Sequence, residues 1–313
     1  MAEITPDAIA STYNKIRGHL RKTPIIDVNP TDLGLPKGAT LTLKLEHLQH
    51  AGSFKTRGAF ANLLTRSVPQ AGVAAASGGN HGAAVAYAAQ QLGHKATIFV
   101  PTISSPAKIQ RIRDFGAELV VKGDRYNDAL ALCETFQKNT GALGLHAFEQ
   151  TETLLGQGTV GLELDAQAPN IDTLLVAVGG GGLIGGIAAW YEGRIRVVAV
   201  EPETSCALHT ALKSNAPVDV EVAGIAADSL GAKRVGSLMF PIARAFVERS
   251  VVVPDSAIQD AQLRLWKSLR MAIEPGGACA MAALLCGAYI PGQNERVGVL
   301  VCGANTEIGG AWG

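Results

Sequence analysis

Four consecutive glycines, Gly179 to Gly182, follow the fully apolar run Leu174 to Val178. The stretch from Leu174 to Tyr191 has no charged residue and is almost long enough to cross a membrane. Its six glycines would cost a helix several kcal/mol, at roughly 1 kcal/mol each. We therefore interpret the stretch as a buried strand, a small-residue loop and a helix, and we expect no membrane partner.

The order of strand, loop and helix recurs along the chain. Further strands are predicted at 40–45, 73–76, 96–100, 118–122, 196–200 and 296–301. Helices are predicted from Pro6, over 58–64, 82–92, 106–115 and 127–138, and from Asp255, as the cap, to about Ile273. Alternating strands and helices are typical of parallel sheets covered on both faces. The expected fold class is therefore α/β, with open, mainly parallel sheets.

Composition fits a closely packed α/β protein. The 313 residues are 47% hydrophobic and include 36 glycines, which suits many close turns. A composition shift near 141–144 suggests a small domain over 51–144. The remaining segments, 1–50 and 145–313, then form a large domain. Ligand loops at the carboxyl ends of strands would fit an active site in the cleft between the two domains, which is where the family resemblance described below puts it.

Charge and cysteine content limit the partners and the compartment. The chain has 27 basic and 27 acidic residues, so no basic face for a nucleic acid is expected. The five cysteines are odd in number and show no C-x-x-C spacing. Free thiols indicate a cytoplasmic protein. The N-terminus has no basic segment followed by an apolar one, so no signal peptide is expected.

Lys55 is the lysine set among small residues, within Ala51 to Ala59, where an aldehyde could reach its amine. Most lysines are solvated surface charges, so the surroundings decide its role. The loop Ser77 to Gly82, the glycine run and Cys302-Gly-Ala-Asn305 supply backbone amides for an anion and polar groups for a ring. The glycine run lacks the spacing of a dinucleotide fingerprint. Together these features favour a cofactor that is an aldehyde and a phosphate.

The segment Ser53 to Ala59 resembles the S-F-K-x-R-G-A motif of the fold-type II pyridoxal-phosphate enzymes, in the branch of the serine/threonine dehydratases and serine racemases. The resemblance extends from Lys22 to Cys302, with the motifs in the family's order. It implies a tryptophan synthase β-like fold of two twisted sheets, pyridoxal 5'-phosphate as cofactor, a small amino acid as substrate and a homodimer.

The resemblance also implies roles for single residues. Lys55 holds the cofactor and acts as the catalytic base. The remaining cofactor-binding residues are Phe54, Asn80, Gly179, Gly180, Gly181, Gly182, Leu183, Glu274 and Cys302. The substrate carboxylate is bound by Ser77, Gly78, Gly79, Asn80 and His81.

Some of these residues have simpler interpretations. Ser77 and Asn80 could cap a helix, and Glu274 could be only the polar end of the long helix. His81 and His146 are single histidines without partner spacing, and such residues are more often structural. Asp228 is expected to order a loop near the site.

No metal site is expected. The segment from Glu201 resembles the part of metal-activated racemases that binds a divalent cation, and Glu201 and the Ser205 carbonyl fit that pattern. Ala207 stands where the second carboxylate should be, and hard cations need several oxygen ligands. A divalent cation is therefore doubtful.

One departure from the family pattern, at Gly78, favours elimination, and so does Cys302, which fits the serine, threonine or cysteine of that pattern beside the ring nitrogen. Racemases of this branch carry a serine where this chain has Gly78, and that serine is their acid/base on the face opposite the lysine. Cys302 is a neutral partner for the ring nitrogen, which disfavours long-lived carbanions. The predicted enzyme is an ammonia-lyase that dehydrates L-threonine or L-serine. The alternatives are 3-hydroxyaspartate or phenylserine as substrate and, less favoured, a racemase or a β-replacing transferase.

Overall fold

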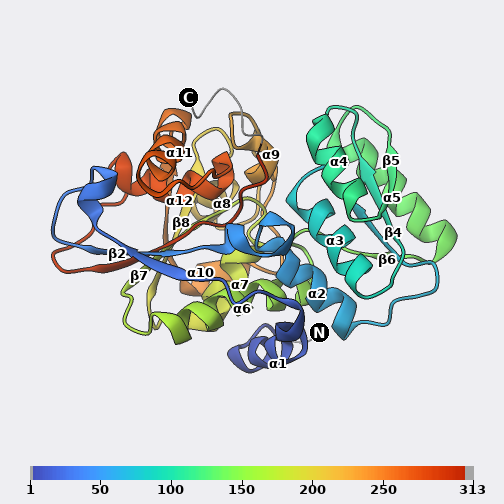
Figure 1. Ribbon diagram of the computed structural model, residues 1–313, viewed down its shortest axis with the longest axis horizontal. Helices are drawn as coiled ribbons and strands as arrows, with labels where there is room; N and C mark the ends of the chain where they lie inside the picture. The colour runs from blue at the N-terminus through green and yellow to red at the C-terminus, as the bar shows by residue number, and fades with distance from the viewer. Residues whose placement is uncertain (1–2, 307–313) are drawn as a thin grey trace.

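The computed structural model describes residues 3–306, which form two β-sheets flanked by helices (Figure 1). One sheet has six strands and the other has four. Every strand pair is parallel except the one between the first two strands. The predicted α/β class, with two mainly parallel sheets and helices on both faces, is confirmed.

The six-stranded sheet has the order β1-β2-β10-β7-β8-β9. Its strands are β1 (Ile25–Val28), β2 (Thr40–Lys44), β7 (Thr173–Ala177), β8 (Arg196–Pro202), β9 (Val247–Val253) and β10 (Arg296–Leu300). The central strand β7 is buried at all five positions, because helices cover both of its faces. A continuous apolar run is what a strand in such a position requires.

Two groups of helices cover this sheet. On one side lie α6 (Thr151–Gln167), α7 (Gly182–Tyr191) and α10 (Phe240–Phe246), and on the other lie α11 (Asp255–Leu269) and α12 (Pro275–Leu285) (Figure 1). The chain moves outward from β7 to β8 through α7 and returns to β10 through α12. Because such crossovers are right-handed, the outward and return helices must cover opposite faces.

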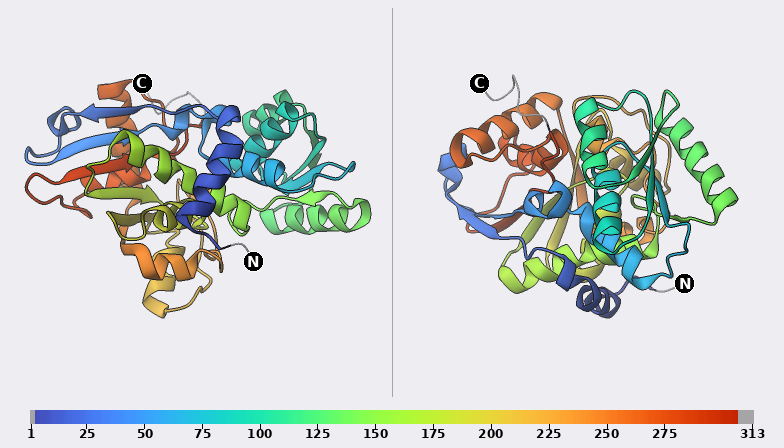
Figure 2. Two further views of the ribbon diagram at one scale, coloured as in Figure 1. Left: turned by 90° about the horizontal axis from the view of Figure 1, so that it is seen from below. Right: turned by 45° about the vertical axis from the view of Figure 1, so that its right-hand side comes forward.

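The four-stranded sheet has the order β5-β4-β3-β6 and lies beside the larger one (Figures 1 and 2). Its strands are β3 (Val73–Ala76), β4 (Ala96–Val100), β5 (Glu118–Val121) and β6 (Leu143–Gly144). Its helices are α3 (Asn80–Gln91), α4 (Pro106–Asp114) and α5 (Tyr126–Thr140). The predicted domain boundaries at 51 and 144 stay a prediction.

The remaining helices link or flank the sheets. They are α1 (Pro6–Ile16), α2 (Lys55–Thr65), α8 (Ala207–Ser214), α9 (Ala227–Leu230) and the short 3-10 helices η1 (Arg17–His19), η2 (Pro30–Leu33), η3 (Glu46–Leu48) and η4 (His50–Gly52). Helix α2 packs on both α6 and α3. It therefore joins the elements of the two sheets.

Several predicted boundaries are wrong. Helix α2 begins at Lys55 rather than at Gly58. Helix α11 ends at Leu269, and Asp255 is its first residue rather than its cap. The Asp255 carboxylate instead accepts a hydrogen bond from the Ile225 amide at 3.0 Å. The Asp255 carboxylate thus binds the distant Ile225 amide, in place of the amides of its own helix that the sequence pattern suggested.

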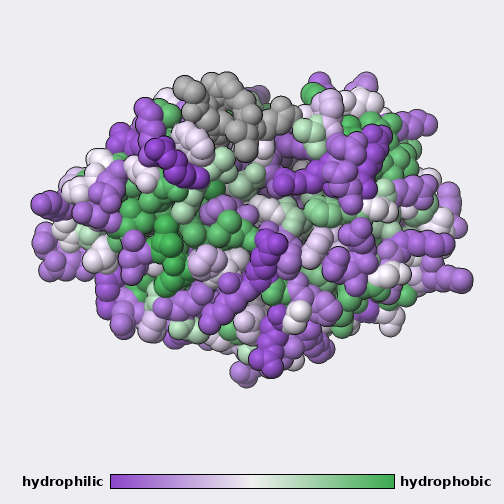
Figure 3. All heavy atoms as spheres, in the orientation of Figure 1, coloured by the Kyte–Doolittle hydropathy of each residue, from purple (hydrophilic) through white to green (hydrophobic). Residues whose placement is uncertain are grey.

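The apolar stretch from Leu174 to Tyr191 is divided as predicted, into β7, the glycine loop and α7. Within residues 3–306 no helix combines the length and the apolar character that crossing a bilayer would need. On the face seen in Figure 3, hydrophilic side chains are spread widely, with smaller hydrophobic areas between them.

Candidate active site

The end of β10 holds Lys55 in place. Ser53 forms an antiparallel bridge with Gly303, and the Phe54 amide donates to the Cys302 carbonyl at 3.1 Å. Helix α2 begins at the next residue. Two segments about 250 residues apart in the chain thus meet, and Lys55 and Cys302 line the same cavity.

The Lys55 amine is in a dry position. Its Nζ donates to the Ala147 carbonyl at 2.9 Å and lies 5.2 Å from the centroid of the Phe54 ring. Burial lowers the pKa of Lys55 to about 8, although the neighbouring Cys302 and Glu274 oppose that shift. A buried ammonium loses hydration, so the neutral amine is favoured. Lys55 is therefore available as a nucleophile or base near neutral pH.

A cavity of about 40 Å³ opens at Lys55. All of the residues predicted to bind the cofactor line it, namely Phe54, Lys55, Asn80, Gly179, Gly180, Gly181, Gly182, Leu183, Glu274 and Cys302. Phe148 and Ser229 line it too, and the sequence analysis missed both. Neither belongs to a motif with a recognisable spacing, so no signal in the sequence pointed to them.

The glycine run has the form of an anion site. Within the described residues, the amides of Gly179, Gly180 and Gly181 donate no hydrogen bond. The first amides of α7, which follow directly, have no acceptor inside the helix. Together they can bind a phosphate, aided by the positive end of the helix. The donors therefore fit the phosphate of pyridoxal phosphate.

Only glycine can occupy parts of this run. Gly181 has φ +88°, and a Cβ there would lie 2.5 Å from Met239 Cε. A Cβ at Gly182 would lie 3.0 Å from Phe148 Cβ. A side chain at either position would enter the space that the loop needs, so the glycines keep the cradle open.

Asn80, Glu274 and Asn305 form a hydrogen-bonded chain. The Asn80 amide donates to Glu274 Oε1 at 2.6 Å, and the Asn305 amide donates to Asn80 Oδ1 at 2.5 Å. Glu274 directly precedes α12, so the alternative that made it the end of the long helix is wrong. The chain fixes the Asn80 side chain at the edge of the Lys55 cavity.

Glu274 and Cys302 are both buried, and burial disfavours the charged form of each. Burial raises the pKa of Glu274, and the Asn80 hydrogen bond and the charges of Lys108 and Arg111 oppose the rise. Burial also raises the pKa of the Cys302 thiol far above its usual range. The Cys302 thiol, whose Sγ lies 3.6 Å from the Gly276 carbonyl, is therefore neutral at physiological pH.

The loop before α3 is only partly turned toward the cavities. Of the five residues predicted to bind the substrate carboxylate, Asn80 is the one that lines a cavity in the described part of the chain. Ser77 Oγ accepts from the Gly79 amide at 3.2 Å. A Cβ at Gly78 would lie 3.0 Å from Ser104 Cβ, so Ser104 closes the space beside it.

Both histidines near Lys55 have structural partners. His81 is buried and its Nε2 lies 3.0 Å from the Leu145 carbonyl. Burial, with the charge of Lys55, lowers the pKa of His81 to about 3. His146 Nδ1 accepts from the amides of Phe148 and Glu149 at 3.3 and 3.0 Å. Both rings are therefore neutral, and neither is placed to bind a carboxylate as a cation.

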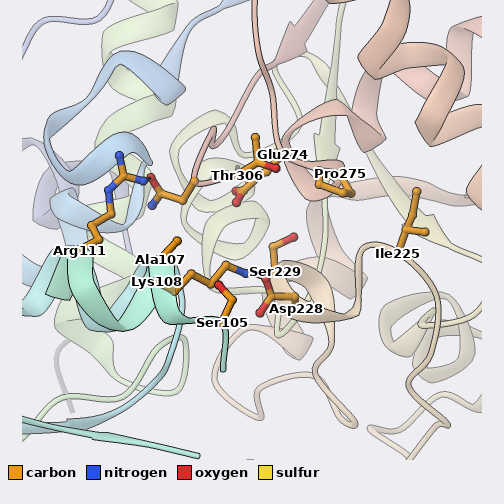
Figure 4. A pocket seen from close by; sticks show the side chains of 11 residues that line it. Ser105, Ala107, Lys108, Arg111, Ile225, Asp228, Ser229, Glu274, Pro275 and Thr306 are labelled. Atoms are coloured by element: carbon orange, nitrogen blue, oxygen red, sulfur yellow. Dashed lines mark hydrogen bonds and ion pairs between the residues drawn. The ribbon is translucent and has the colours of Figure 1, made fainter. Parts of the chain in front are cut away.

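A larger cavity, of about 460 Å³, adjoins the first and shares Ser229 and Glu274 with it (Figure 4). Helix α4 supplies Lys108 and Arg111 to its wall. Lys108 forms an ion pair with Asp228 of α9, and Figure 4 shows these two side chains pointing toward one another. Arg111 donates to the side-chain oxygen of Asn305. Asp228 thus lies at the site, as expected, with a partner on the other side of the cavity.

The sequence analysis missed Lys108 and Arg111, although a signal was present. They are three residues apart in a helix that was correctly predicted to start at Pro106, and that spacing puts both on one helix face. What the sequence could not supply was the α9 segment that the face meets.

Glu201 has no oxygen left for a cation. Its Oε1 accepts from the Leu208 amide at 2.7 Å, and its Oε2 accepts from the His209 amide at 2.7 Å and from Ser250 Oγ at 2.6 Å. Throughout residues 3–306, no group of three acidic, histidine or cysteine side chains could hold a metal ion. Glu201 instead fixes the start of α8.

Comparison with known proteins adds an independent line of observation. The family model described as "Pyridoxal-phosphate dependent enzyme" matches residues 16–303. Phenylserine dehydratase from Ralstonia pickettii is 36% identical, over 96% of this chain and 93% of its own length. L-threonine ammonia-lyase from Geobacter sulfurreducens is 36% identical, over 96% of this chain and 75% of its own length. The solved structure of maize serine racemase superposes with a TM-score of 0.91 at 30% identity, over 97% of this chain and 94% of that one.

Proposed function

Because the chain belongs to the family of pyridoxal-phosphate-dependent enzymes, we propose that it is a dehydratase of β-hydroxy-α-amino acids. It removes water from a substrate such as L-threonine or L-serine and releases a 2-oxo acid and ammonia. One observation carries the proposal: a half-buried lysine with a pKa of about 8 lines the same cavity as an anion site of unpartnered amides. The similar phenylserine dehydratase and L-threonine ammonia-lyase support it.

Lys55 is the proposed base. When bound, pyridoxal phosphate supplies an electron sink that acidifies the hydrogen on the substrate α-carbon. The Lys55 amine takes that proton, since burial favours its neutral form. The β-hydroxyl then leaves with a proton as water. The released enamine takes up water and loses ammonia, which gives the 2-oxo acid.

The other residues bind and orient. The amides of Gly179 to Gly182 and Leu183 would hold the phosphate, and Asn80, which Glu274 and Asn305 fix in place, would hold the ring. Phe54 packs beside the Lys55 amine. We propose Ser77, Gly78 and Gly79, with Asn80, for the substrate carboxylate through their amides and hydroxyl. His81 is left out of that set, because its ring bonds the Leu145 carbonyl.

Two features support elimination over racemisation. The neutral Cys302 thiol cannot hold a positive charge on the cofactor ring as a carboxylate would, so the electron sink is weaker and the β-hydroxyl leaves promptly. Gly78 has no side chain to return a proton from the opposite face, and Ser104 fills the neighbouring space. Serine racemase remains among the similar proteins, so the product must be tested directly.

Proton NMR in deuterated buffer tests the proposal. The purified enzyme is given L-threonine, L-serine, phenylserine and both diastereomers of 3-hydroxyaspartate. A 2-oxo acid should form from at least one of them, and Lys55→Ala should abolish its formation while the protein stays folded. Deuterium entering the α-position without any 2-oxo acid would mean that the hydroxyl does not leave, which contradicts a dehydratase.

Two further proposals concern the oligomeric state of the protein and its cellular compartment. We propose a homodimer, on family membership alone, and sedimentation velocity would test it. A cytoplasmic location is supported by the five cysteines, all of which are free. Fractionation of the source cells would test that location.

A further inference from the structure

The wall of the larger cavity carries an arginine that has an uncharged partner. Lys108 is paired with Asp228. Among residues 3–306, the polar partner of Arg111 is the neutral side-chain oxygen of Asn305. A guanidinium binds a carboxylate more strongly than a neutral acceptor, because the two opposite charges attract and the pair can be bidentate. An anionic ligand in this cavity would therefore displace Asn305.

Arg111 lies close to the reacting region. Its partner Asn305 donates to Asn80 at 2.5 Å, and Asn80 lines the Lys55 cavity. The charge of Arg111 also acts on Glu274, which lines both cavities. Arg111 is thus joined to Asn80 through a single residue, Asn305, and the cavity that it lines adjoins the one at Lys55.

The remaining lining argues against an aromatic side chain. The apolar residues of the larger cavity are Ala107, Ile225 and Pro275, and none of its lining residues within 3–306 is aromatic. The other lining residues are polar or charged: Ser105, Lys108, Arg111, Asp228, Ser229, Glu274, Asn305 and Thr306. A phenyl group would leave many of these polar groups without water or a partner, which is costly.

We propose that Arg111 binds the second carboxylate of a dicarboxylic substrate, so that the substrate class is the β-hydroxy-α-amino dicarboxylic acids, of which 3-hydroxyaspartate is the smallest. This inference rests on the proposed function and names the substrate class of the same site. The reaction balances as before: water leaves, water enters, and ammonia is released with oxaloacetate. The α-carboxylate stays at the loop that precedes α3.

Binding of non-reacting acids tests Arg111 without turnover. Succinate and butanoate have four carbons each and differ by one carboxylate. Titration calorimetry on the cofactor-loaded enzyme should show succinate binding at least about tenfold tighter than butanoate, as one charge-assisted pair provides. Arg111→Gln should remove that preference and leave butanoate within about twofold, while Arg111→Lys should restore part of it. The matched control is Arg113→Gln, because Arg113 is exposed on the same helix and does not line the cavity.

Three results would overturn the proposal. The first is that the wild-type enzyme binds succinate and butanoate with the same affinity. The second is that Arg111→Gln leaves succinate binding intact. The third is that Arg111→Gln weakens the binding of both acids equally, as expected if Arg111 held the α-carboxylate. Turnover gives a separate arm, in which kcat/KM for one 3-hydroxyaspartate diastereomer should exceed that for L-threonine and should fall at least tenfold in Arg111→Gln. If no substrate yields a 2-oxo acid, the proposed function fails, while the succinate titration still decides the role of Arg111.

Discussion

Two groups of charged side chains differ sharply in their surroundings, although both belong to elements that carry the site. Behind α2, Arg57 makes a bidentate pair with Glu46 at 2.8 and 2.7 Å and lies 3.2 Å from Glu163. Lys44 completes this buried ion network, with Nζ 2.6 Å from Glu163. The four side chains are at most 2% exposed. Across the larger cavity, Lys108 and Asp228 are 23% and 60% exposed.

The buried charges hold a residue in place, whereas the charges of the larger cavity are suited to bind a ligand. The two positive and two negative charges of the buried ion network cancel. Thr23 donates a further hydrogen bond to Glu46, and Arg57 donates one to Thr159. These interactions are strong in the low dielectric of the interior, so they fix the geometry of the network. It ties α2, which begins with Lys55, to β2 and α6. The cavity ions face water, where an ion pair is worth little and exchanges partners easily. Lys55, the proposed base, is thus held in a fixed position. The charged side chains of the adjoining larger cavity can rearrange around a substrate.

The largest effect is expected from breaking the buried ion network. Glu46→Gln keeps the shape of the side chain but removes the carboxylate that pairs with the Arg57 guanidinium through two hydrogen bonds. Breaking a buried ion pair costs about 3–5 kcal/mol. The free energy of unfolding in urea should fall by that amount. Glu118→Gln, at an exposed position, is the control and should change it by less than about 0.5 kcal/mol. A loss below about 1 kcal/mol for Glu46→Gln would show that the network does not hold α2.

A second prediction asks what sets the pKa of Lys55. Burial is the largest cause that lowers the pKa of Lys55 to about 8. The charges of the buried ion network cancel, so the network adds no net charge near the amine. The pKa is below that of a solvated lysine, so about half of the amine is neutral at pH 8 and nearly all of it by about pH 9, and the neutral fraction falls about tenfold for each pH unit well below pH 8.

The rate at which cofactor-free protein takes up pyridoxal phosphate, followed by absorbance, should therefore rise through pH 8 and level off by about pH 9. The ionisation of free pyridoxal phosphate is corrected with butylamine, whose reaction is measured alongside. A rate that still rises steeply between pH 9 and 10 would indicate a solvated amine.

The smallest effect is expected from the cavity ions. Asp228→Asn removes the charge that Lys108 faces, yet the loss in the free energy of unfolding should stay within about 1 kcal/mol, because the pair is exposed. The same urea titration at low and high salt measures it, and salt should reduce the difference between variant and wild type. A loss as large as that of Glu46→Gln would remove the contrast between the two groups.

The sequence predicted most of what short patterns can encode. The strand and the glycines from Leu174 to Gly182, the loop after β3 and the lysine at the start of α2 are local features, and each is where its pattern indicated. Strands β1, β6 and β9 were not predicted, because polar residues interrupt β1 and the middle of β9, and β6 has only two residues.

Contacts between distant segments were beyond the sequence. Nothing near Lys108 in the chain points to Asp228, and nothing near Glu46 points to Glu163, because these partners meet only when the sheets and helices have packed. The alternative that Glu274 ends the long helix failed for a similar reason: the chain leaves that helix at Arg270, whose φ is +58°, and a non-glycine residue in that conformation has no clear sequence signal.

The central claim is that Lys55, rather than another lysine, holds the cofactor, and chemical trapping tests it directly. Protein loaded with pyridoxal phosphate is reduced with borohydride, which fixes the cofactor to the lysine that carries it, and is then digested for peptide mass spectrometry. The account predicts the added mass on the peptide that contains Lys55, and none in Lys55→Ala. Labelling of Lys108, the other lysine that lines a cavity described above, or of no lysine at all, would contradict it.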